Sequence, residues 1–484
     1  MRTKITFKES IAVIIIISLF VFGFLYCTGT LLSGYHLVDD HEFYTIGDTL
    51  KDNGLWKTMG ICVKNDFQIR FRPLYYIERV LGVALFGAGT FRWSCMKALE
   101  IIMATYLLYI FVRSKGENKT KAILFAALCV WGPQTAIWWR LGPQESFGIF
   151  LFSLSLNATW QLAQNRKIVN RILFIIFLML LSMQKESFMV CIPAFFILLF
   201  AFDQNAEGKF IQDIKNFIKK YVIEIITLLL CLIIEVGLIF WRVGLNQIGY
   251  AGFSSQDSVS YYFNGMLHNL VTWGKYPMLL VLFAFVLVYI VGDRGSVDKQ
   301  SRLELLFCFY IWGIQLLVYA KSGMWERYLI PWMISVAYFV VLCVSKMLNK
   351  SVRAAWCIML AGILLCIFNS KDIFNEASIF TTKGNNLGVC AEELVKRTDS
   401  SVQIYGVSND LELDDSFGVY MQHKYGYEHY KRIGQDSAGA QAYFGKNDAV
   451  EKYFIENNID SDDYDWIITE SYEAAILREI EIRY

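Results

Sequence analysis

Four consecutive ionisable residues, Asp39-Asp40-His41-Glu42, follow directly on an apolar run from Ile11 to Leu32. A run of about 20 apolar residues can cross a hydrocarbon core of roughly 30 Å, so we expect the acidic pair at the membrane surface. There a carboxylate can meet a lipid headgroup and a water-borne acceptor together, and can act as a general base. The sequence favours Asp40 as the base, because His41 and Glu42 could orient it, with Asp39 as the second candidate.

Further charged residues are predicted to reach the same membrane face from other outer loops. An ionisable residue costs about 2.5–3.5 kcal/mol at a helix centre, so charges beside a span need a reason. Cations at this face would suit a lipid phosphate, and carboxylates would suit proton transfer. The candidate substrate-binding residues are His41, Glu42, Arg70 and Arg72 in the first outer loop, Arg140 and Glu145 in the second, Lys185 and Glu186 in the third, and Glu326, Arg327 and Tyr328 in the fifth.

Each of these charges also has a plainer interpretation. Outer-loop charges are commonly solvated residues that flank a span, and Arg140, after two tryptophans, could simply anchor a helix end at the interface. Lys185 and Glu186 could form a surface ion pair worth well under about 1 kcal/mol. The short apolar run Ile172–Met183 argues against this, because it would place the pair slightly below the interface.

Two of the histidines are candidate metal ligands. His36 and His41, on either side of the acidic pair, could help to bind a divalent cation, so a divalent cation is the candidate cofactor and its ligands stay open. His268, His423 and His429 have no partner at a suitable spacing, and we interpret them as structural or exposed.

Composition excludes an ordinary soluble enzyme. Of 484 residues, 55% are hydrophobic and only 18% are charged, and the mean hydropathy is +0.40. The long apolar stretches that recur through position 369 are typical of membrane spans. A net charge of +1 gives no indication of nucleic-acid binding, and the 11 cysteines are scattered without a CxxC pair, so neither a disulfide framework nor a zinc site is predicted.

The distribution of Lys and Arg sets the predicted orientation, because cytoplasmic loops carry an excess of these residues. Cations before the first span place the N-terminus in the cytoplasm. The short apolar segment Pro73–Ala88 carries Glu78 and Arg79, and we interpret it as an interfacial helix on the outer leaflet, with the second span at Phe91–Val112. The cytoplasmic clusters are then Arg113–Lys121, Arg166–Arg171, Lys209–Lys220, Arg294–Arg302 and Lys346–Arg353.

This topology predicts an all-α polytopic protein of the plasma membrane with about 11 transmembrane helices. The transmembrane domain covers residues 1–369, and its outer loop 33–90 carries the acidic residues. From Ser370 the apolar runs end, and short β-like runs alternate with helix-like ones, so residues 370–484 are predicted to form a small α/β domain outside the cytoplasm. The β-like runs are Val402–Val407 and Trp466–Thr469, and the helix-like runs are Ser416–His423 and Ala449–Glu456.

Several motifs, in the same order along residues 10–345, resemble the GT-C polytopic glycosyltransferases, especially the protein O-mannosyltransferase and tetratricopeptide-associated O-mannosyltransferase branches. Asp39-Asp40 matches the family's acidic pair after the first span. Arg72-Pro73 through Leu85-Phe86-Gly87 is similar to its interfacial helix. The remaining matches are a loosely similar outer turn at Ala136 to Glu145, Leu180 to Glu186 with Pro193, and Glu326 to Leu329 with Pro331. The C-terminal domain has no counterpart in this comparison.

The resemblance implies a GT-C-like fold and an enzyme that takes a sugar from a polyprenyl-phosphate carrier at the outer face. The acceptor would be a glycan, a lipid or a protein, with membrane lipid as the surrounding partner. The residues fit this chemistry: a base for an acceptor hydroxyl, and Arg327 and Lys185 for the leaving phosphate. One base and no second nucleophile predict an inverting hexosyl transfer.

Two other functions remain open. A flippase or transporter of lipid-linked saccharides would also have many spans, but it would be expected to place charges near the bilayer midplane, in paired halves with broken helices. A polysaccharide polymerase or ligase would share the chemistry and differ in its acceptor. The acceptor of a labelled lipid-linked sugar would separate the two enzymes, and carrier movement without bond cleavage would indicate a transporter.

Overall fold

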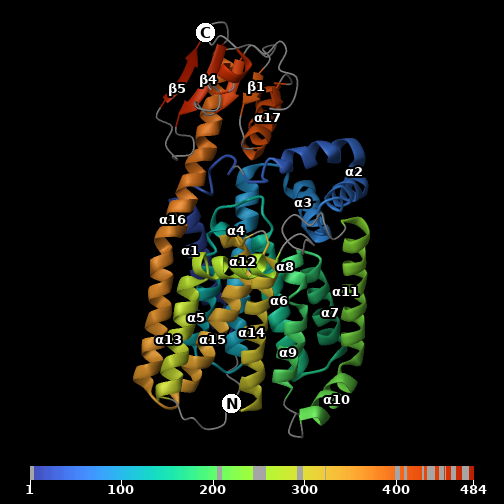
Figure 1. Cartoon of the computed structure of the whole chain (residues 1–484), viewed down its shortest axis with the longest axis vertical. Coiled ribbons are helices and arrows are strands. Elements are labelled where there is room, and N and C mark those ends of the chain that lie inside the picture. Colours follow the sequence, from blue (N-terminus) through green and yellow to red (C-terminus); the bar gives the residue numbers. More distant parts are fainter. Residues whose placement is uncertain are drawn as a thin grey trace.

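The computed structural model has an elongated helical bundle with a small sheet at one end (Figure 1). It describes residues 5–36, 38–203, 210–243, 258–291, 298–321 and 323–397. In the C-terminal part it describes residues 404–407, 411–427, 430–432, 442–445, 452, 454–458, 465–470 and 479–483.

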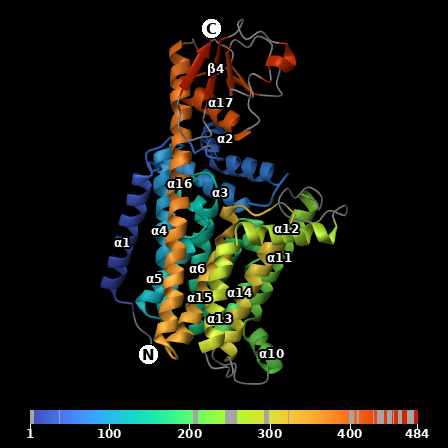
Figure 2. The ribbon, with the colours of Figure 1, turned by 60° about the vertical axis from the view of Figure 1, so that its left-hand side comes forward.

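The bundle is formed by long apolar helices that run along the long axis (Figures 1 and 2). Six described helices are long and apolar enough to cross a membrane, or seven when a bent pair counts as one span, which identifies a multi-pass membrane protein. The predicted number of about 11 spans therefore stays a prediction. The bundle helices are α1 (Phe7–Cys27), α4 (Thr90–Ser114), α5 (Lys119–Val130), α6 (Glu145–Gln164), α7 (Ile168–Ser182), α9 (Ile192–Phe202), α11 (Val222–Arg242), α13 (Lys275–Val291), α14 (Lys299–Val318), α15 (Ile330–Leu348) and α16 (Val352–Arg397).

Helix α15 forms the centre of the bundle. Apolar residues surround it on all sides, which is typical of a helix with no solvent face. Trp332, Met333 and Val336 near its N-terminus are fully or almost fully buried. The short helix η2 (Glu326–Leu329) leads directly into α15, so the charged residues of η2 adjoin a deeply buried helix.

Short elements gather at the sheet end of the bundle. Helices α2 (Glu42–Asp66) and α3 (Pro73–Phe86) lie there, toward the C-terminal sheet (Figure 2). Pro73 opens α3 at a position where the missing N–H costs nothing. Helix α3 coincides with the predicted segment Pro73–Ala88, and its interfacial position in a membrane stays a prediction. The other short helices are η1 (Thr135–Trp138), α8 (Glu186–Met189), α12 (Val259–Thr272), bent by 79° from α13, and α10 (Phe210–Lys220), which lies at the opposite end (Figure 1).

The C-terminal part forms a five-stranded sheet in the order β2-β1-β3-β4-β5. Strand β1 (Ile404–Val407) pairs in parallel with β2 (Tyr430–Arg432) and with β3 (Ala442–Gly445). Strand β4 (Asp465–Glu470) is parallel to β3, and β5 (Glu479–Arg483) closes the sheet antiparallel to β4. Helix α17 (Leu411–Tyr425) follows β1. The predicted α/β character is therefore present, although much of the run Ala449–Glu456 lies outside the described residues.

Two predicted boundaries differ from the structure. Helix α16 passes through Ser370 without a break, so the boundary between residues 369 and 370 lies inside a helix. The composition changes there because α16 leaves the apolar bundle and exposes Lys371 and Asp372, and charged residues do not end a helix (Figure 2). Helix α1 ends at Cys27 rather than Leu32, because Gly29 adopts a φ of 78° and the Thr28 hydroxyl donates to the Phe24 carbonyl at 3.0 Å.

Candidate active site

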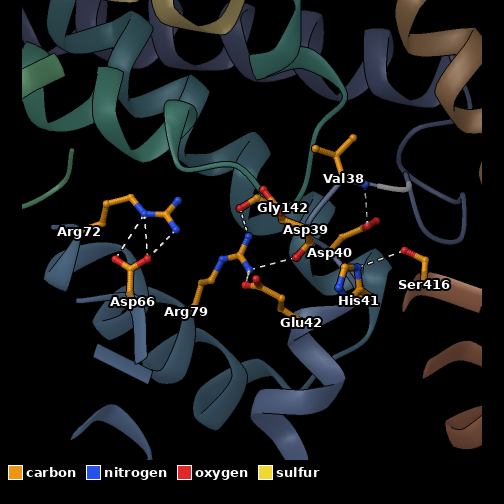
Figure 3. A network of polar contacts seen from close by, with 10 residues as sticks. All are labelled: Val38, Asp39, Asp40, His41, Glu42, Asp66, Arg72, Arg79, Gly142 and Ser416. Carbon is orange, nitrogen blue, oxygen red and sulfur yellow. Dashed lines mark hydrogen bonds and ion pairs between the residues drawn. The ribbon is translucent and has the colours of Figure 1, made fainter. Parts of the chain in front are cut away.

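Asp40 is a buried structural carboxylate. It lies in the acidic loop, which we define as residues 33–42 between α1 and α2. Its side chain is 0% exposed and accepts hydrogen bonds from two backbone N–H groups, those of His36 and of Val38. The contact with Val38 measures 3.2 Å (Figure 3). Burial raises the pKa of Asp40 to about 7. Both carboxylate oxygens accept N–H groups of the turn that they stabilise. This arrangement gives no support to Asp40 as a general base.

Asp39 lies in a different environment. Its backbone is left-handed, with a φ of 57°, a conformation that Asp and Asn tolerate better than most residues. The side chain is partly buried, and no described residue hydrogen-bonds to its carboxylate. Burial would raise the pKa of Asp39, but the positive charges of Arg79, Arg72 and Arg327 outweigh it and lower that pKa. Asp39 is therefore an ionised carboxylate whose pKa is lowered by cations from two of the loops that the sequence predicts to lie outside the cytoplasm, the predicted outer loops.

Arg79 of α3 fixes the backbone around Asp39. This side chain is 1% exposed, and it donates to the Asp39 carbonyl at 3.0 Å, to the Gly142 carbonyl and to the Glu42 carboxylate (Figure 3). Its guanidinium carbon lies 4.2 Å from the centre of the Tyr75 ring. Arg79 is not among the candidate site residues predicted from the sequence. The signal was an arginine in the middle of a short apolar helix, because a buried arginine requires partners.

Gly142 brings the second outer loop against the acidic loop. A Cβ atom at this position would lie 2.1 Å from the Val38 carbonyl oxygen and 2.7 Å from the Asp39 carbonyl carbon. Only glycine permits this approach of two backbones. The glycine therefore joins the turn after Arg140 to the backbone of the candidate base.

Two ion pairs lie in the neighbouring outer loops. Arg140 Nη2 lies 3.3 Å from Glu326 Oε1, and its guanidinium stacks 4.3 Å from the Trp139 ring centre. Lys185 donates to Glu145 at 2.9 Å. All four charged side chains are at least mostly buried, so these are not the solvated surface pairs of the plainer interpretation.

Tyr328 connects Lys185 to Arg327, the cation of η2. Lys185 Nζ lies 3.9 Å from the centre of the Tyr328 ring. Arg327 Nη2 lies 3.3 Å from the Tyr328 hydroxyl oxygen and donates to it. Arg327 is partly exposed, and its charge acts on Asp39.

The remaining predicted residues hold the chain that enters α3. Arg72 forms a two-pronged ion pair with Asp66, at 2.7 Å for the shortest contact, and stacks 4.5 Å from the Tyr75 ring centre. Glu186 accepts the Phe71 N–H at 3.1 Å, which joins the third outer loop to the first. Arg70 is partly buried in the same stretch.

The described residues contain no group of three or more His, Cys, Asp or Glu side chains that could hold a metal ion. His36 pairs with the Ser33 hydroxyl, and His41 Nδ1 lies 3.1 Å from the Ser416 hydroxyl of α17. These two histidines therefore fit the candidate divalent cation poorly. Of the other histidines, His423 lies against α2, and His429 is outside the described residues.

The arrangement is that of a multi-pass membrane protein in which charged loops gather between the bundle and a C-terminal sheet. The solved structure of ArnT from Cupriavidus metallidurans bound to undecaprenyl phosphate has the same fold, with a TM-score of 0.52 at 10% sequence identity. The similarity covers 93% of this chain and 88% of that chain. The expected GT-C-like fold is thus confirmed, whereas the O-mannosyltransferase branches remain a resemblance of motifs.

ArnT from the same organism in the apo state gives a TM-score of 0.49 at 10% identity, covering 97% of this chain and 96% of that chain. No protein-family model and no curated protein sequence matches the chain.

Proposed function

We propose that the protein transfers a sugar from a polyprenyl-phosphate donor to a hydroxyl-bearing acceptor at the outer face of the plasma membrane. The observation that carries this proposal is the environment of Asp39: its partly buried carboxylate accepts no hydrogen bond from the described residues, and the positive charges of Arg79, Arg72 and Arg327 lower its pKa. A GT-C fold surrounds it, and a protein of this fold has been crystallised with undecaprenyl phosphate.

The proposed reaction is a single displacement. The acceptor oxygen attacks the anomeric carbon, its proton passes to an oxygen of Asp39, and the bond from the anomeric carbon to the phosphate oxygen breaks. The electron pair of that bond leaves with the polyprenyl phosphate. A general base of this kind contributes about 10²–10⁴-fold. One base opposite one leaving group implies inversion at the anomeric carbon.

Asp39 replaces Asp40 as our candidate base. A base needs a free oxygen within reach of the acceptor, and both oxygens of Asp40 accept N–H groups of its own loop. Asp39 lies one residue earlier, and no described residue hydrogen-bonds to its carboxylate. The neighbouring residues His41 and Glu42, which favoured Asp40 in the sequence, have other partners. His41 contacts the Ser416 hydroxyl, and Glu42 accepts a hydrogen bond from Arg79.

Arg327 is the candidate ligand of the leaving phosphate. It projects from η2, beside Tyr328, and its charge reaches Asp39, so a phosphate bound there would lie near the base. A guanidinium suits this role because it can donate two parallel hydrogen bonds to phosphate oxygens. Lys185, above the Tyr328 ring, is a second candidate ligand of the same phosphate, although its ammonium group is already paired with Glu145.

The test is a reconstituted assay with a labelled polyprenyl-phosphate sugar in vesicles. Transfer predicts loss of label from the lipid carrier and its appearance in an acceptor fraction, with both lost in Asp39→Asn. A flippase or transporter predicts that the intact labelled lipid changes leaflets with no bond cleavage, which would refute the proposal. A polymerase or ligase would cleave the bond and place the label on a growing or completed glycan, and would identify the acceptor class.

A further inference from the structure

We infer that the C-terminal part of the chain positions the acidic loop for catalysis. Helix α17 and the stretch of α16 beyond the bundle (residues 377–391) together form what we call the C-terminal clamp. Its positioning residues are Gly384 and Ser416, neither of which reaches the reacting atoms. The catalytic consequence rests on the proposed function, whereas the hold on the loop stands on contacts alone.

Helix α16 touches the backbone at the start of the acidic loop. A Cβ atom on Gly384 would lie 1.6 Å from the Tyr35 carbonyl oxygen, which no side chain can occupy. A Cβ atom on Gly34 would meet the Gly384 carbonyl oxygen at 3.5 Å, so the two glycines face each other. One turn before Gly384, the Thr381 hydroxyl lies 3.4 Å from the Thr30 hydroxyl. Helix and loop thus approach at backbone distance, which makes the loop position depend on α16.

The same stretch of α16 also supports the second outer loop. Phe380 stacks on Trp139, with ring centres 3.8 Å apart and planes within 12°. Ala377 packs with Val38 and Trp139 in one apolar cluster. The loop that carries Trp139 continues to Gly142, which contacts the Asp39 backbone. Helix α16 therefore reaches Asp39 from two directions.

Helix α17 contacts the end of the acidic loop and the start of α2. Ser416 Oγ lies 3.1 Å from His41 Nδ1 (Figure 3), and His423 Nε2 lies 2.7 Å from Asp48 Oδ2. The His423 and Tyr44 rings also contact each other, at 4.8 Å between centres. Tyr35 of the acidic loop forms a buried apolar cluster with clamp residues such as Leu387 and Phe417, separate from the bundle core.

Asp39 consequently lies between two supports, Arg79 with Gly142 on one side and the clamp on the other. Its left-handed backbone is a costly conformation that persists only where the surroundings hold it. A displacement of about 1 Å at a catalytic group can lower a rate by about 10²-fold. Loosening the clamp should therefore release the loop and lower the rate of transfer, with little effect on donor binding at η2.

Gly384→Ala and Ser416→Ala test this inference. Gly313→Ala is the matched control for the first, because nothing lies within 4 Å of a Cβ there, and exposed Gln422→Ala on α17 is the control for the second. Ser416→Thr keeps the hydroxyl and should behave as the unmodified protein. Two readouts are measured on the full chain: hydrogen exchange of the amides of residues 33–42, and kcat and donor KM for transfer.

The clamp predicts faster amide exchange in the acidic loop and a kcat lowered about tenfold or more in Gly384→Ala and Ser416→Ala, with donor KM unchanged. If Gly384→Ala does not fold, the comparison of Ser416→Ala with Ser416→Thr tests the inference by itself. Unchanged exchange in the loop would overturn the hold itself. Faster exchange with an unchanged kcat would overturn the catalytic consequence. A protein that shows no transfer in any form would refute the proposed function, and the exchange measurement would still decide the hold.

Discussion

The carboxylates of Asp39 and Asp40 belong to adjacent residues and lie in opposite environments. Asp40 points into the loop and accepts the N–H groups of His36 and Val38, whereas Asp39 faces the charges of Arg79, Arg72 and Arg327. The left-handed backbone at Asp39 turns the two side chains apart. One carboxylate thus builds the loop and the other is available for chemistry.

Asp40→Asn should change stability in a pH-dependent way. An uncharged amide resembles the protonated carboxyl in shape, and each accepts well through one carbonyl oxygen, so we expect the variant and the unmodified protein to have similar stability near pH 4. The folded-state pKa of Asp40 is raised from 3.8 to about 7, so the stability that its protonated form contributes is complete below pH 4 and is lost as the pH rises to about 7. Because the amide does not titrate, the melting temperature of the unmodified protein should fall relative to that of Asp40→Asn from pH 4 to pH 7. A relative rise with pH would show that the ionised carboxylate stabilises the loop.

Arg79→Lys should lower kcat by about tenfold or more, with donor KM unchanged, because a lysine cannot bridge Glu42, the Asp39 carbonyl and the Gly142 carbonyl together. Steady-state kinetics with the lipid donor measure this. The control is Arg92→Lys, since Arg92 is exposed and donates only to the Phe86 carbonyl among the described contacts. Equal activity of the two variants would remove Arg79 from the site.

Arg327→Gln and Lys185→Gln should separate donor binding from stability. Arg327→Gln should raise donor KM with a nearly unchanged melting temperature, because Arg327 is partly exposed. Lys185→Gln removes the cation that is hydrogen-bonded to buried Glu145 and should cost about 3–5 kcal/mol. The double variant Lys185→Gln/Glu145→Gln should recover much of that stability. Should the double variant also recover a normal donor KM, Lys185 would be a structural residue alone, and an unchanged KM in Arg327→Gln would remove Arg327 from the phosphate site.

The C-terminal domain should lie outside the cytoplasm, as the distribution of basic loops predicts. A cysteine at Ile455, which is 78% exposed, should react with an impermeant thiol reagent applied to intact cells or spheroplasts. A cysteine at Asn349, in the exposed connection between α15 and α16, should react only after lysis. The reverse pattern would invert the topology and move the proposed site to the cytoplasmic face.

Patterns local in the chain were predictable from the sequence. An apolar run flanked by basic residues indicates a span, and Pro73 with the following apolar residues indicates a helix, which the structure contains as α3. The β-like runs overlap β1 and β4, and Ser416–His423 falls within α17. The extension of α16 beyond Ser370 was missed, because charge and polarity report on solvent exposure rather than on where a helix ends.

The candidate site depends on contacts between distant segments, which spacing along the chain does not reveal. Gly142 approaches Asp39 and Gly384 approaches Tyr35, although each pair is more than 100 positions apart in the sequence. A single glycine in a sequence does not indicate such an approach, because glycine has many other uses. The roles of Asp39 and Asp40 depend on which carboxylate turns toward the backbone N–H groups, a detail set by the φ angle of one residue. The outer-loop charges were found because ionisable residues beside spans are few.

Asp39→Asn tests the central claim most directly. Vesicles that contain the unmodified protein, Asp39→Asn or Asp40→Asn are given labelled polyprenyl-phosphate sugar and an acceptor extract, and the initial rate of label transfer is measured beside equilibrium donor binding. The account predicts that Asp39→Asn lowers transfer by roughly 10²-fold or more with donor binding and melting temperature retained. Transfer by Asp39→Asn at the rate of the unmodified protein would contradict it.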